Sequence, residues 1–330
     1  MQVFALFQDG APPRYSLLGA TVHHIGRPHT GVRAMARLVR EHRRAPFDVL
    51  HGIWGSPAGL LAAAAGRVLR RPSLIHLFGG ELVSLPDVPY GEMRTRKGRQ
   101  RMRFAMGAAT RLTAQSGWQV KAATELGYSV ERVPMGVDAG EWPPVPPRVR
   151  DPHRPARFIH VASISPVKDQ ATLIRAMARL NEQGRDFRLD VVGEDTMGGA
   201  VQRLAEPLGD RVRFHGVLTQ AEIRPLMLEA DVLIMTSRSE AGPIVLAEAA
   251  MCGVPTVGTA VGQIAEWAPD AAVAVAVANP DALAAAITGL LDDEPRRIRI
   301  STLAQARARA EDADRTAARI NRLYREMTQR

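Results

Sequence analysis

Short apolar runs alternate with stretches of helical periodicity along almost the whole chain. In the second half, the apolar runs predict strands at 157–163, 187–193, 212–217, 231–237, 255–259 and 271–277. Apolar residues at helical spacing predict helices near 169–183, 199–208, 219–230, 242–252 and 280–293. Strands that alternate with helices are typical of a parallel, doubly wound sheet, whose ligand crevice lies beyond the carboxyl ends of the strands.

The first half alternates in the same way, and a proline-rich stretch separates it from the second. Its apolar runs predict strands near 2–8, 20–25, 47–52, 73–78, 111–115 and 130–134. Prolines concentrate between positions 142 and 155, as in a stiff linker between domains. We therefore expect an N-terminal domain at 1–143, a linker at 144–156, a second domain at 157–310 and an Arg/Ala-rich terminal helix at 311–330.

One lysine and two glutamates stand at or near the ends of predicted strands. Lys168 and Glu240 each follow a strand directly, so both should line the crevice. Glu248 lies further on, in an Ala-rich helix that Gly242 and Pro243 would open. Ionised carboxylates only accept hydrogen bonds, so two of them could hold two sets of hydroxyls on one extended, sugar-containing ligand. For a bare Glu-x7-Glu spacing, the alternative is two solvated glutamates on a helix face.

The sequence around these glutamates resembles a known signature. In order along the chain stand Ser239, Glu240, Gly242, Glu248, Cys252, Gly253, Pro255 and Gly258. This order is similar to the Glu-x7-Glu signature of the retaining glycosyltransferases of family four, and weaker matches follow in family order at 47–51, 133–138, 163–169, 190–193 and 213–216. The resemblance covers nearly the whole chain. It implies an α/β fold of the GT-B type, in which two Rossmann-like, doubly wound domains face each other across a cleft and the terminal helix crosses back to the first domain.

The resemblance also implies roles for residues of the second domain. Lys168 falls at the position that contacts the donor diphosphate, and it is one of only three lysines in the chain. Ser163 stands where most members have an arginine, so the diphosphate should be held more weakly, or with help from another arginine. Glu240 is expected to bind the hydroxyls of the donor sugar, and Glu248 the ribose diol. Backbone near the donor sugar, at the positive end of a helix dipole, would come from Gly242, Pro243, Ile244 and Val245.

Three residues of the first domain are candidates for contacts across the cleft. Where the family often has His-Gly, this chain has Phe78 and Gly79. The nearest imidazole is that of His76, two residues earlier on the same strand face. His76 could reach the donor sugar, or it could be a hydrogen-bonded histidine of the core.

The N-terminus departs from the family pattern. Family members open with a strand, a Gly-rich loop and a helix, whereas the strand near 2–8 is followed here by a short polar segment at 8–12. We expect a shortened first domain, with 8–12 as a stunted replacement for that loop and helix. With Ser163 and Phe78, this departure leaves an alternative to a transferase: a truncated, catalytically impaired protein that binds sugar nucleotides.

The implied activity is transfer of a hexose from a nucleoside-diphosphate sugar to a hydroxyl acceptor, with retention of the anomeric configuration. Acceptors in the family are often lipid-linked or belong to cell-envelope polysaccharide precursors. We expect no cofactor, because the nucleotide sugar is itself the donor substrate. We also expect no metal site, because the histidines lack metal-ligand spacing and Asp312-Ala313-Asp314 lies in an Arg-rich helix rather than after a strand.

Composition limits the class of protein and its compartment. At 330 residues and 46% apolar, the chain is long enough for two domains with their own cores. The single cysteine, Cys252, rules out an internal disulfide and fits the reducing cytoplasm. No apolar run approaches the ~20 residues that span a bilayer, and the N-terminus lacks a signal-peptide pattern. We expect a cytoplasmic protein.

Positive charge is concentrated in the first half, which holds 21 basic against 10 acidic residues within 1–150. The densest cluster, with Met93, Met102, Phe104 and Met106 interleaved, consists of Arg94, Arg96, Lys97, Arg99, Arg101 and Arg103. This cluster could bind an anionic membrane surface or acceptor, or it could be the solvated face of an Arg-rich helix. No nucleic-acid-binding motif accompanies it, so we do not expect nucleic acid as a partner; DNA or RNA affinity that falls steeply with salt would indicate otherwise.

Overall fold

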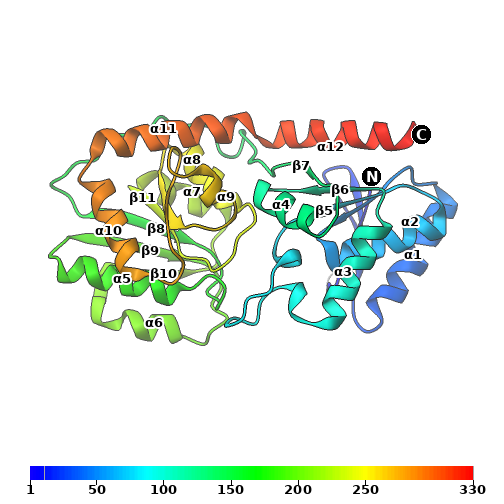
Figure 1. Cartoon of the computed structure of the whole chain (residues 1–330), viewed down its shortest axis with the longest axis horizontal. Coiled ribbons are helices and arrows are strands. Elements are labelled where there is room, and N and C mark those ends of the chain that lie inside the picture. Colours follow the sequence, from blue (N-terminus) through cyan, green and yellow to red (C-terminus); the bar gives the residue numbers. More distant parts are fainter. Residues whose placement is uncertain (11, 330) are drawn as a thin grey trace.

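Two α/β domains lie side by side in the computed structural model, which describes residues 1–10 and 12–329 (Figure 1). The second half forms one sheet of six parallel strands, ordered β10-β9-β8-β11-β12-β13. These strands are β8 (Ala156–Val161), β9 (Phe187–Val192), β10 (Val212–Gly216), β11 (Val232–Met235), β12 (Thr256–Thr259) and β13 (Val273–Val275). All six strands expected in this half are therefore present, and the doubly wound arrangement is confirmed.

Helices cover both faces of this sheet. They are α5 (Gln170–Glu182), α6 (Ala200–Ala205), α7 (Gln220–Glu229), α8 (Ile244–Met251), α9 (Gly262–Trp267) and α10 (Pro280–Leu291), with a 3₁₀ helix at Glu206–Arg211. One apolar cluster packs α8 against the sheet, and the other packs α5 and α10 against the opposite face. Leu173, Met177 and Leu180, which recur at helical spacing along α5, are buried there. Glu222 caps α7, because its carboxylate accepts a 2.8 Å hydrogen bond from the backbone N–H of Thr219.

The first half divides into two smaller sheets. Four parallel strands follow the order β4-β5-β6-β7, and a three-stranded sheet has the order β1-β3-β2. The strands are β1 (Gln2–Leu6), β2 (Arg14–Leu17), β3 (Ala20–Ile25), β4 (Leu50–Ile53), β5 (Ser73–Leu77), β6 (Arg111–Ala114) and β7 (Glu131–Arg132). The helices are α1 (Thr30–Arg44), α2 (Leu60–Leu69), α3 (Arg96–Ala108) and α4 (Gly117–Glu125).

Strand β2 was not predicted. It pairs antiparallel with β3, and all four of its residues are exposed, so it lacks the alternation of apolar and polar positions by which a strand is recognised. The segment 8–12, for which we expected a replacement loop, leads into this strand; of that segment, residue 11 lies outside the described residues.

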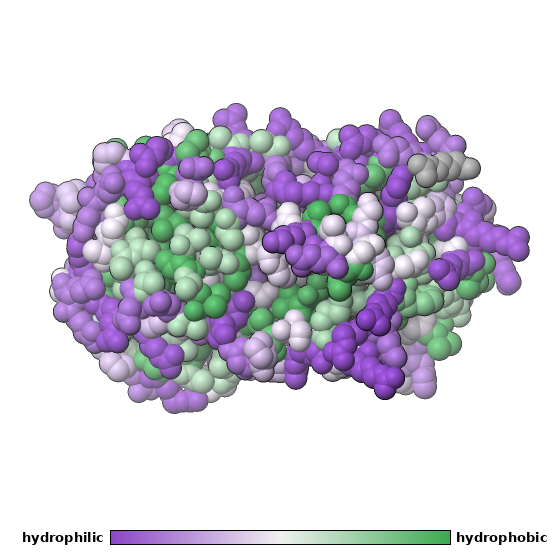
Figure 2. Space-filling model, viewed as in Figure 1, coloured by the Kyte–Doolittle hydropathy of each residue, from purple (hydrophilic) through white to green (hydrophobic). Residues whose placement is uncertain are grey.

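Two long C-terminal helices join the domains. α11 (Glu294–Ala310) packs on α8, and α12 (Ala313–Thr328) runs on along the first domain, as the upper edge of Figure 1 shows. The hydroxyl of Tyr324 on α12 lies 2.7 Å from Nδ1 of His51, at β4. The chain at position 136 passes close to the residue that follows α11, and only a glycine fits there, because a Cβ on Gly136 would lie 2.0 Å from the backbone oxygen of Glu311. Hydrophilic side chains line this edge of the molecule (Figure 2).

The proline-rich segment between the domains is fixed to the second domain by a buried carboxylate. Asp231, at the start of β11, is fully buried. Its oxygens lie 2.6 Å from Arg154, 3.3 Å from Arg148 and 3.9 Å from Arg150. Three arginines around one carboxylate compensate its burial, so the segment is held by charge as well as by its prolines.

The basic cluster lies on and before α3, and here one expectation is corrected. Arg94, Arg96, Lys97, Arg99 and Arg103 are exposed, and Arg101 pairs with Glu92 at 3.3 Å. However, Met102 and Met106 are 0% and 3% exposed and belong to the core beneath the helix. They are not interleaved with the surface arginines, because helical periodicity places them on the inner face. Within the described residues, none of the helices has the length and apolar composition that crossing a bilayer requires.

Candidate active site

The structure brings Lys168 and Glu240 together. Lys168 lies in the loop between β8 and α5, and Glu240 follows β11, its neighbour in the sheet. The ammonium Nζ is 2.5 Å from Oε1 of Glu240, whose side chain is only 9% exposed. The hydroxyl of Ser237 donates a 2.6 Å hydrogen bond to the same oxygen. A charged pair at the carboxyl edge of a parallel sheet can exchange its internal partner for an anion and a hydroxyl of a ligand.

Glu248 lies on the second turn of α8 and is 8% exposed. Among the described residues, no side chain forms a hydrogen bond or ion pair with its carboxylate. Burial raises the pKa of Glu248 to about 7. A desolvated carboxyl group without a protein partner is suited to accept hydrogen bonds from a ligand that enters the cleft.

This raised pKa has a consequence for the ligand-free protein. Because the folded protein disfavours the charged form, the stabilisation from neutral Glu248 is complete below the unfolded pKa and is lost as the pH rises through about 7. Glu248→Gln, which stays neutral, should therefore raise the free energy of unfolding at about pH 8 by on the order of 1–3 kcal/mol, with little change near pH 4.5. Thermal denaturation at the two pH values tests this. Equal stabilisation at both would show that Glu248 titrates normally.

The four residues predicted to present their backbone to a donor sugar lie in the turn before α8 and in its first turn, and the placement of one of them is corrected. Pro243 is the N-cap of α8 rather than its first helical residue, since its ψ of 120° is not helical. Ile244 is 37% exposed, whereas the side chain of Val245 lies in the core at 9%. Gly242 is in contact with the first domain: a Cβ on this residue would lie 2.4 Å from Oε1 of Gln115. The domains thus meet at the start of α8.

Ser163 shares the loop between β8 and α5 with Lys168, and Arg238, which was not predicted, lies beside this loop. Ser163 follows β8 and is exposed, and its backbone oxygen accepts a 3.0 Å hydrogen bond from Gln170. The backbone N–H of Arg238 donates to the oxygen of Val167 at 2.7 Å. Its guanidinium reaches across the cleft to Asp87 at 2.5 Å. Arg238 is therefore an arginine beside Lys168 that could supply the positive charge absent at Ser163.

In the first domain, His76 lies beneath the cleft surface. It is 2% exposed, and its Nδ1 is 2.8 Å from the hydroxyl of Thr113. Burial, with a smaller contribution from His51, lowers the pKa of His76 to about 4, so the imidazole is neutral. This environment is that of a core histidine, and it does not bring the ring to the surface of the cleft.

Phe78 and Gly79 are held at the end of β5 by a glutamate that was not predicted. Glu81 is 3% exposed, and its carboxylate accepts hydrogen bonds from the N–H groups of Phe78 at 2.8 Å, Gly79 at 2.6 Å and Gly55 at 3.2 Å. This one side chain joins the loops that follow β4 and β5. Its role could not be recognised from sequence, because Gly55 is 26 positions away.

A loop of the first domain extends over the pair. Tyr90 and Asp87 belong to the segment between β5 and α3, which reaches towards the second domain in Figure 1. Burial, followed by the carboxylates of Glu240 and Glu81, raises the pKa of Tyr90 to about 12. Tyr90 therefore lies within electrostatic reach of Glu240, and its hydroxyl stays protonated at neutral pH.

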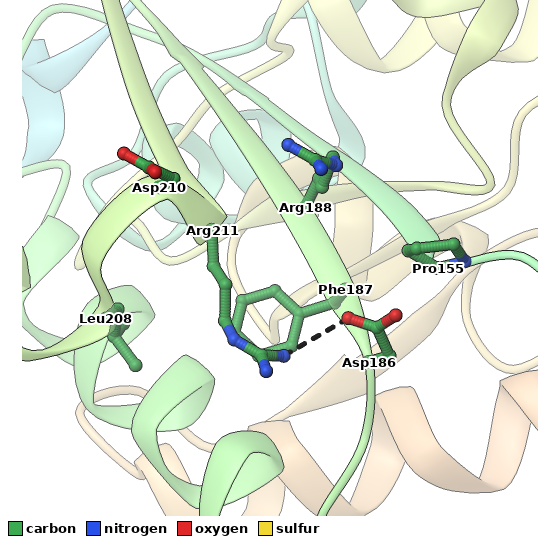
Figure 3. Close-up of a pocket in the computed structure, with 7 residues that line it drawn as sticks. All are labelled: Pro155, Asp186, Phe187, Arg188, Leu208, Asp210 and Arg211. Carbon is green, nitrogen blue, oxygen red and sulfur yellow. Dashed lines mark hydrogen bonds and ion pairs between the residues drawn. The ribbon is translucent and has the colours of Figure 1, made fainter.

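A hollow of about 320 Å³ lies elsewhere (Figure 3). It is lined by Pro155, Asp186, Phe187, Arg188, Leu208, Asp210 and Arg211. These residues precede or begin β8, β9 and β10, so the hollow lies at the amino edge of the sheet, away from Lys168 and Glu240. Since ligands of such sheets bind at the carboxyl edge, the hollow is not the predicted site. Among the described residues, no group of three or more potential ligands could hold a metal ion.

Family comparisons match both halves of the chain. The family described as glycosyl transferases group 1 matches residues 146–307, and the glycosyl transferase 4-like domain matches residues 1–137.

Relatives with assigned names are similar over much of the chain. The GDP-mannose-dependent monoacylated alpha-(1-6)-phosphatidylinositol monomannoside mannosyltransferase of Corynebacterium glutamicum is 26% identical, over 86% of this chain and 76% of the relative. The MMP alpha-(1->4)-mannosyltransferase of Mycolicibacterium hassiacum is 31% identical, over 78% of this chain and 64% of the relative. A D-inositol 3-phosphate glycosyltransferase of Thermomonospora curvata is 30% identical, over 66% of this chain and 57% of the relative. The match therefore spans less than two thirds of the last two relatives.

Solved structures share the fold. Sucrose-phosphate synthase from Thermosynechococcus elongatus has a TM-score of 0.81 at 19% identity, over 99% of this chain and 88% of that one. HepE from Anabaena, in complex with UDP and glucose, has a TM-score of 0.75 at 21% identity, over 93% of this chain and 86% of that one. These likenesses confirm the expected GT-B fold of two Rossmann-like domains.

Proposed function

Since this chain belongs to the glycosyltransferases that its two halves match, we propose that it transfers a hexose from a nucleoside-diphosphate sugar to a hydroxyl acceptor with retention of configuration. The observation that carries this proposal is the Lys168–Glu240 pair at the cleft, with Glu248 further along the adjoining helix. Two of the proteins compared support the donor class by name, since one is GDP-mannose-dependent and another was solved with UDP and glucose.

In this mechanism Lys168 exchanges Glu240 for the donor diphosphate. The bond between the anomeric carbon and the phosphate oxygen breaks, and Lys168, Ser163 and the first N–H groups of α8 stabilise the leaving charge. The acceptor oxygen bonds to the anomeric carbon from the leaving-group face, and its proton passes to the departing phosphate. Glu240 holds hydroxyls of the sugar, and Glu248 accepts hydrogen bonds from the ribose diol.

The test of this function is donor consumption. The purified chain, incubated with UDP-, GDP- and ADP-linked hexoses, should release the nucleoside diphosphate from one of them by transfer or by slow hydrolysis. If one of these sugar nucleotides binds but none is consumed, the transferase proposal fails. The alternative, a protein that binds sugar nucleotides without transfer, then takes its place. Ser163 is the observation that favours this alternative, because a hydroxyl supplies no charge to the diphosphate.

Nucleotide binding should depend on Glu248 under either function. Glu248→Ala removes the acceptor for the ribose diol and should weaken binding of the nucleoside diphosphate by at most about 3 kcal/mol, as for a hydrogen bond to a charged group. Isothermal titration calorimetry measures this loss. Glu229, exposed on α7, provides the control as Glu229→Ala, for which affinity should not change. Unchanged affinity of Glu248→Ala would remove Glu248 from the nucleotide site.

We further propose that the enzyme works at the cytoplasmic face of a membrane, on a lipid-linked or cell-envelope acceptor. The exposed arginines on and before α3 belong to the domain that would receive the acceptor. Each basic side chain near an anionic leaflet contributes about 1 kcal/mol, so the five exposed ones suffice for reversible binding.

Liposome co-sedimentation tests the membrane proposal. The chain should sediment with vesicles that contain anionic lipid and should be released by high salt. Binding should fall in a variant in which three basic residues become glutamine, namely Arg96, Arg99 and Arg103. Binding should not fall in a control variant in which three exposed arginines of the second domain become glutamine, namely Arg175, Arg188 and Arg299. If the chain binds neutral vesicles as well as anionic ones, or binds neither kind, these arginines are only a solvated face.

A further inference from the structure

Three aromatic side chains converge on the first-domain side of the cleft. Trp54 follows β4 and is 49% exposed, and its ring lies 4.9 Å from that of Phe78, at 60° between planes. Gly79 separates them from Tyr90: a Cβ on Gly79 would lie 3.6 Å from Nε1 of Trp54 and 3.7 Å from the hydroxyl of Tyr90. Any side chain at Gly79 would occupy the space between these polar atoms.

This arrangement is not a piece of core. Two of the other three tryptophans, Trp142 and Trp267, are 2% and 3% exposed, as expected for large apolar rings. Half of Trp54 is instead left in contact with solvent, although burial of its ring would stabilise the fold.

The backbone holds Trp54 in an unfavourable conformation. Its φ of 70° with ψ of 144° lies in a region that bulky residues rarely adopt, at a cost of about 1–3 kcal/mol. Two hydrogen bonds fix it, from Trp54 N–H to the oxygen of His76 at 3.0 Å and from Gly59 N–H to the oxygen of Trp54 at 2.8 Å. Glu81 fixes the neighbouring loop through its bonds to Phe78 and Gly79. Strain maintained by a rigid frame at an exposed ring is typical of a binding site.

The three rings lie beside the proposed reaction centre. Tyr90 is within electrostatic reach of Glu240. The side chain of Gln115, which contacts Gly242, donates a 3.4 Å hydrogen bond to the backbone oxygen of Phe78. Through Gln115, the aromatic group is therefore connected to Gly242, two positions after Glu240, on the opposite side of the cleft.

We propose that Trp54 and Phe78 form a platform on which the ring of a pyranose or cyclitol acceptor stacks, with Tyr90 hydrogen-bonded to one of its hydroxyls. One face of such a ring presents C–H groups, which pack on an aromatic surface, while its edge presents hydroxyls. The indole N–H of Trp54 and the phenol of Tyr90 supply donors at that edge. These polar atoms suit a hydroxylated ring and not an acyl chain, so the platform selects for the ring part of the acceptor. Binding of a ring to the platform does not depend on the proposed function. Only the role of that ring as the acceptor rests on it.

Ligand-observed NMR tests the binding site directly. The probes are methyl α-mannopyranoside and myo-inositol, compared with 1-octanol as a chain without a ring. Saturation should transfer from the protein to C–H groups of at least one ring probe. Trp54→Ala or Phe78→Ala should weaken binding of that probe by about 3- to 10-fold, which is the contribution of one aromatic pair. Trp54→Phe should retain part of the affinity, and the control Phe104→Ala, at an exposed ring of α3, should retain all of it.

Kinetics separate this inference from the proposed function. In Trp54→Ala, the KM for the ring acceptor should rise about 3- to 10-fold. Hydrolysis of the donor in the absence of acceptor should change by no more than about twofold, because the proposal assigns Trp54 to the acceptor and not to the donor. Ring binding that is unchanged in Trp54→Ala and Phe78→Ala, or binding of octanol alone, would overturn the platform while leaving the transferase intact. If no donor is consumed but ring binding depends on Trp54, the platform stands and the proposed function fails.

Discussion

Replacing Lys168 by alanine is expected to lower kcat by at least about 10-fold, towards the 10²-fold that loss of one donor to a developing anion typically costs. Lys168 is the only ammonium in the loop between β8 and α5, and the neighbouring Ser163 carries no charge. The variant also leaves the carboxylate of Glu240 with Ser237 as its remaining partner. Steady-state kinetics with saturating donor measure the effect.

The chain offers a matched control, because it has only three lysines. Lys121 is exposed on α4, and Lys121→Ala should leave kcat unchanged. Lys168→Arg should recover part of the activity, since it restores charge without the compact ammonium. Equal kcat for wild type and Lys168→Ala would remove Lys168 from the site.

Replacing Glu240 by glutamine is expected to lower kcat/KM by about 10²-fold. The exchange preserves shape but removes the charge that accepts hydrogen bonds from the sugar hydroxyls, and two such bonds contribute about 3 kcal/mol together. It also frees Lys168, whose Nζ lies 2.5 Å from Glu240 Oε1. The control is Glu229→Gln on α7, which should match the wild type.

The pair should act as a unit. Because the two side chains are in direct contact, the double variant Lys168→Ala, Glu240→Gln should lose less activity than the product of the two single losses. Strictly multiplicative losses would mean that the two residues serve the reaction independently, and that their contact has no part in it.

Much of the fold could be predicted because most strands of the second domain are short apolar runs between helices, even where, as in the edge strand β10, the residues are not fully buried. Helix α9 was missed, since Gly262–Trp267 is only six residues long and carries no repeating stripe. Strand β2 was missed because it has no buried face. Met102 and Met106 were assigned to a surface cluster from their neighbours in sequence, although helical geometry turns them inward.

For the candidate site, sequence identified residues that follow strands but not the partners that hold them. Lys168 and Glu240 were found because their positions relative to strands define one edge of a sheet. Glu81, Tyr90 and Arg238 were not found, because their significance arises from contacts across loops or domains that no local pattern encodes. Trp54 could be seen in the sequence, but neither its exposure nor its strained backbone could.

The anomeric configuration of the transferred sugar tests most directly whether the protein is a retaining transferase. With the nucleoside-diphosphate hexose that the chain consumes and the ring acceptor that it binds, NMR of the product reports the one-bond coupling constant between the anomeric carbon and its proton, which differs between the two anomers. The product should have the same configuration as the donor, and it should be formed by the wild type and lost in Lys168→Ala. An inverted product, or a donor that is bound but never consumed, would contradict retaining transfer.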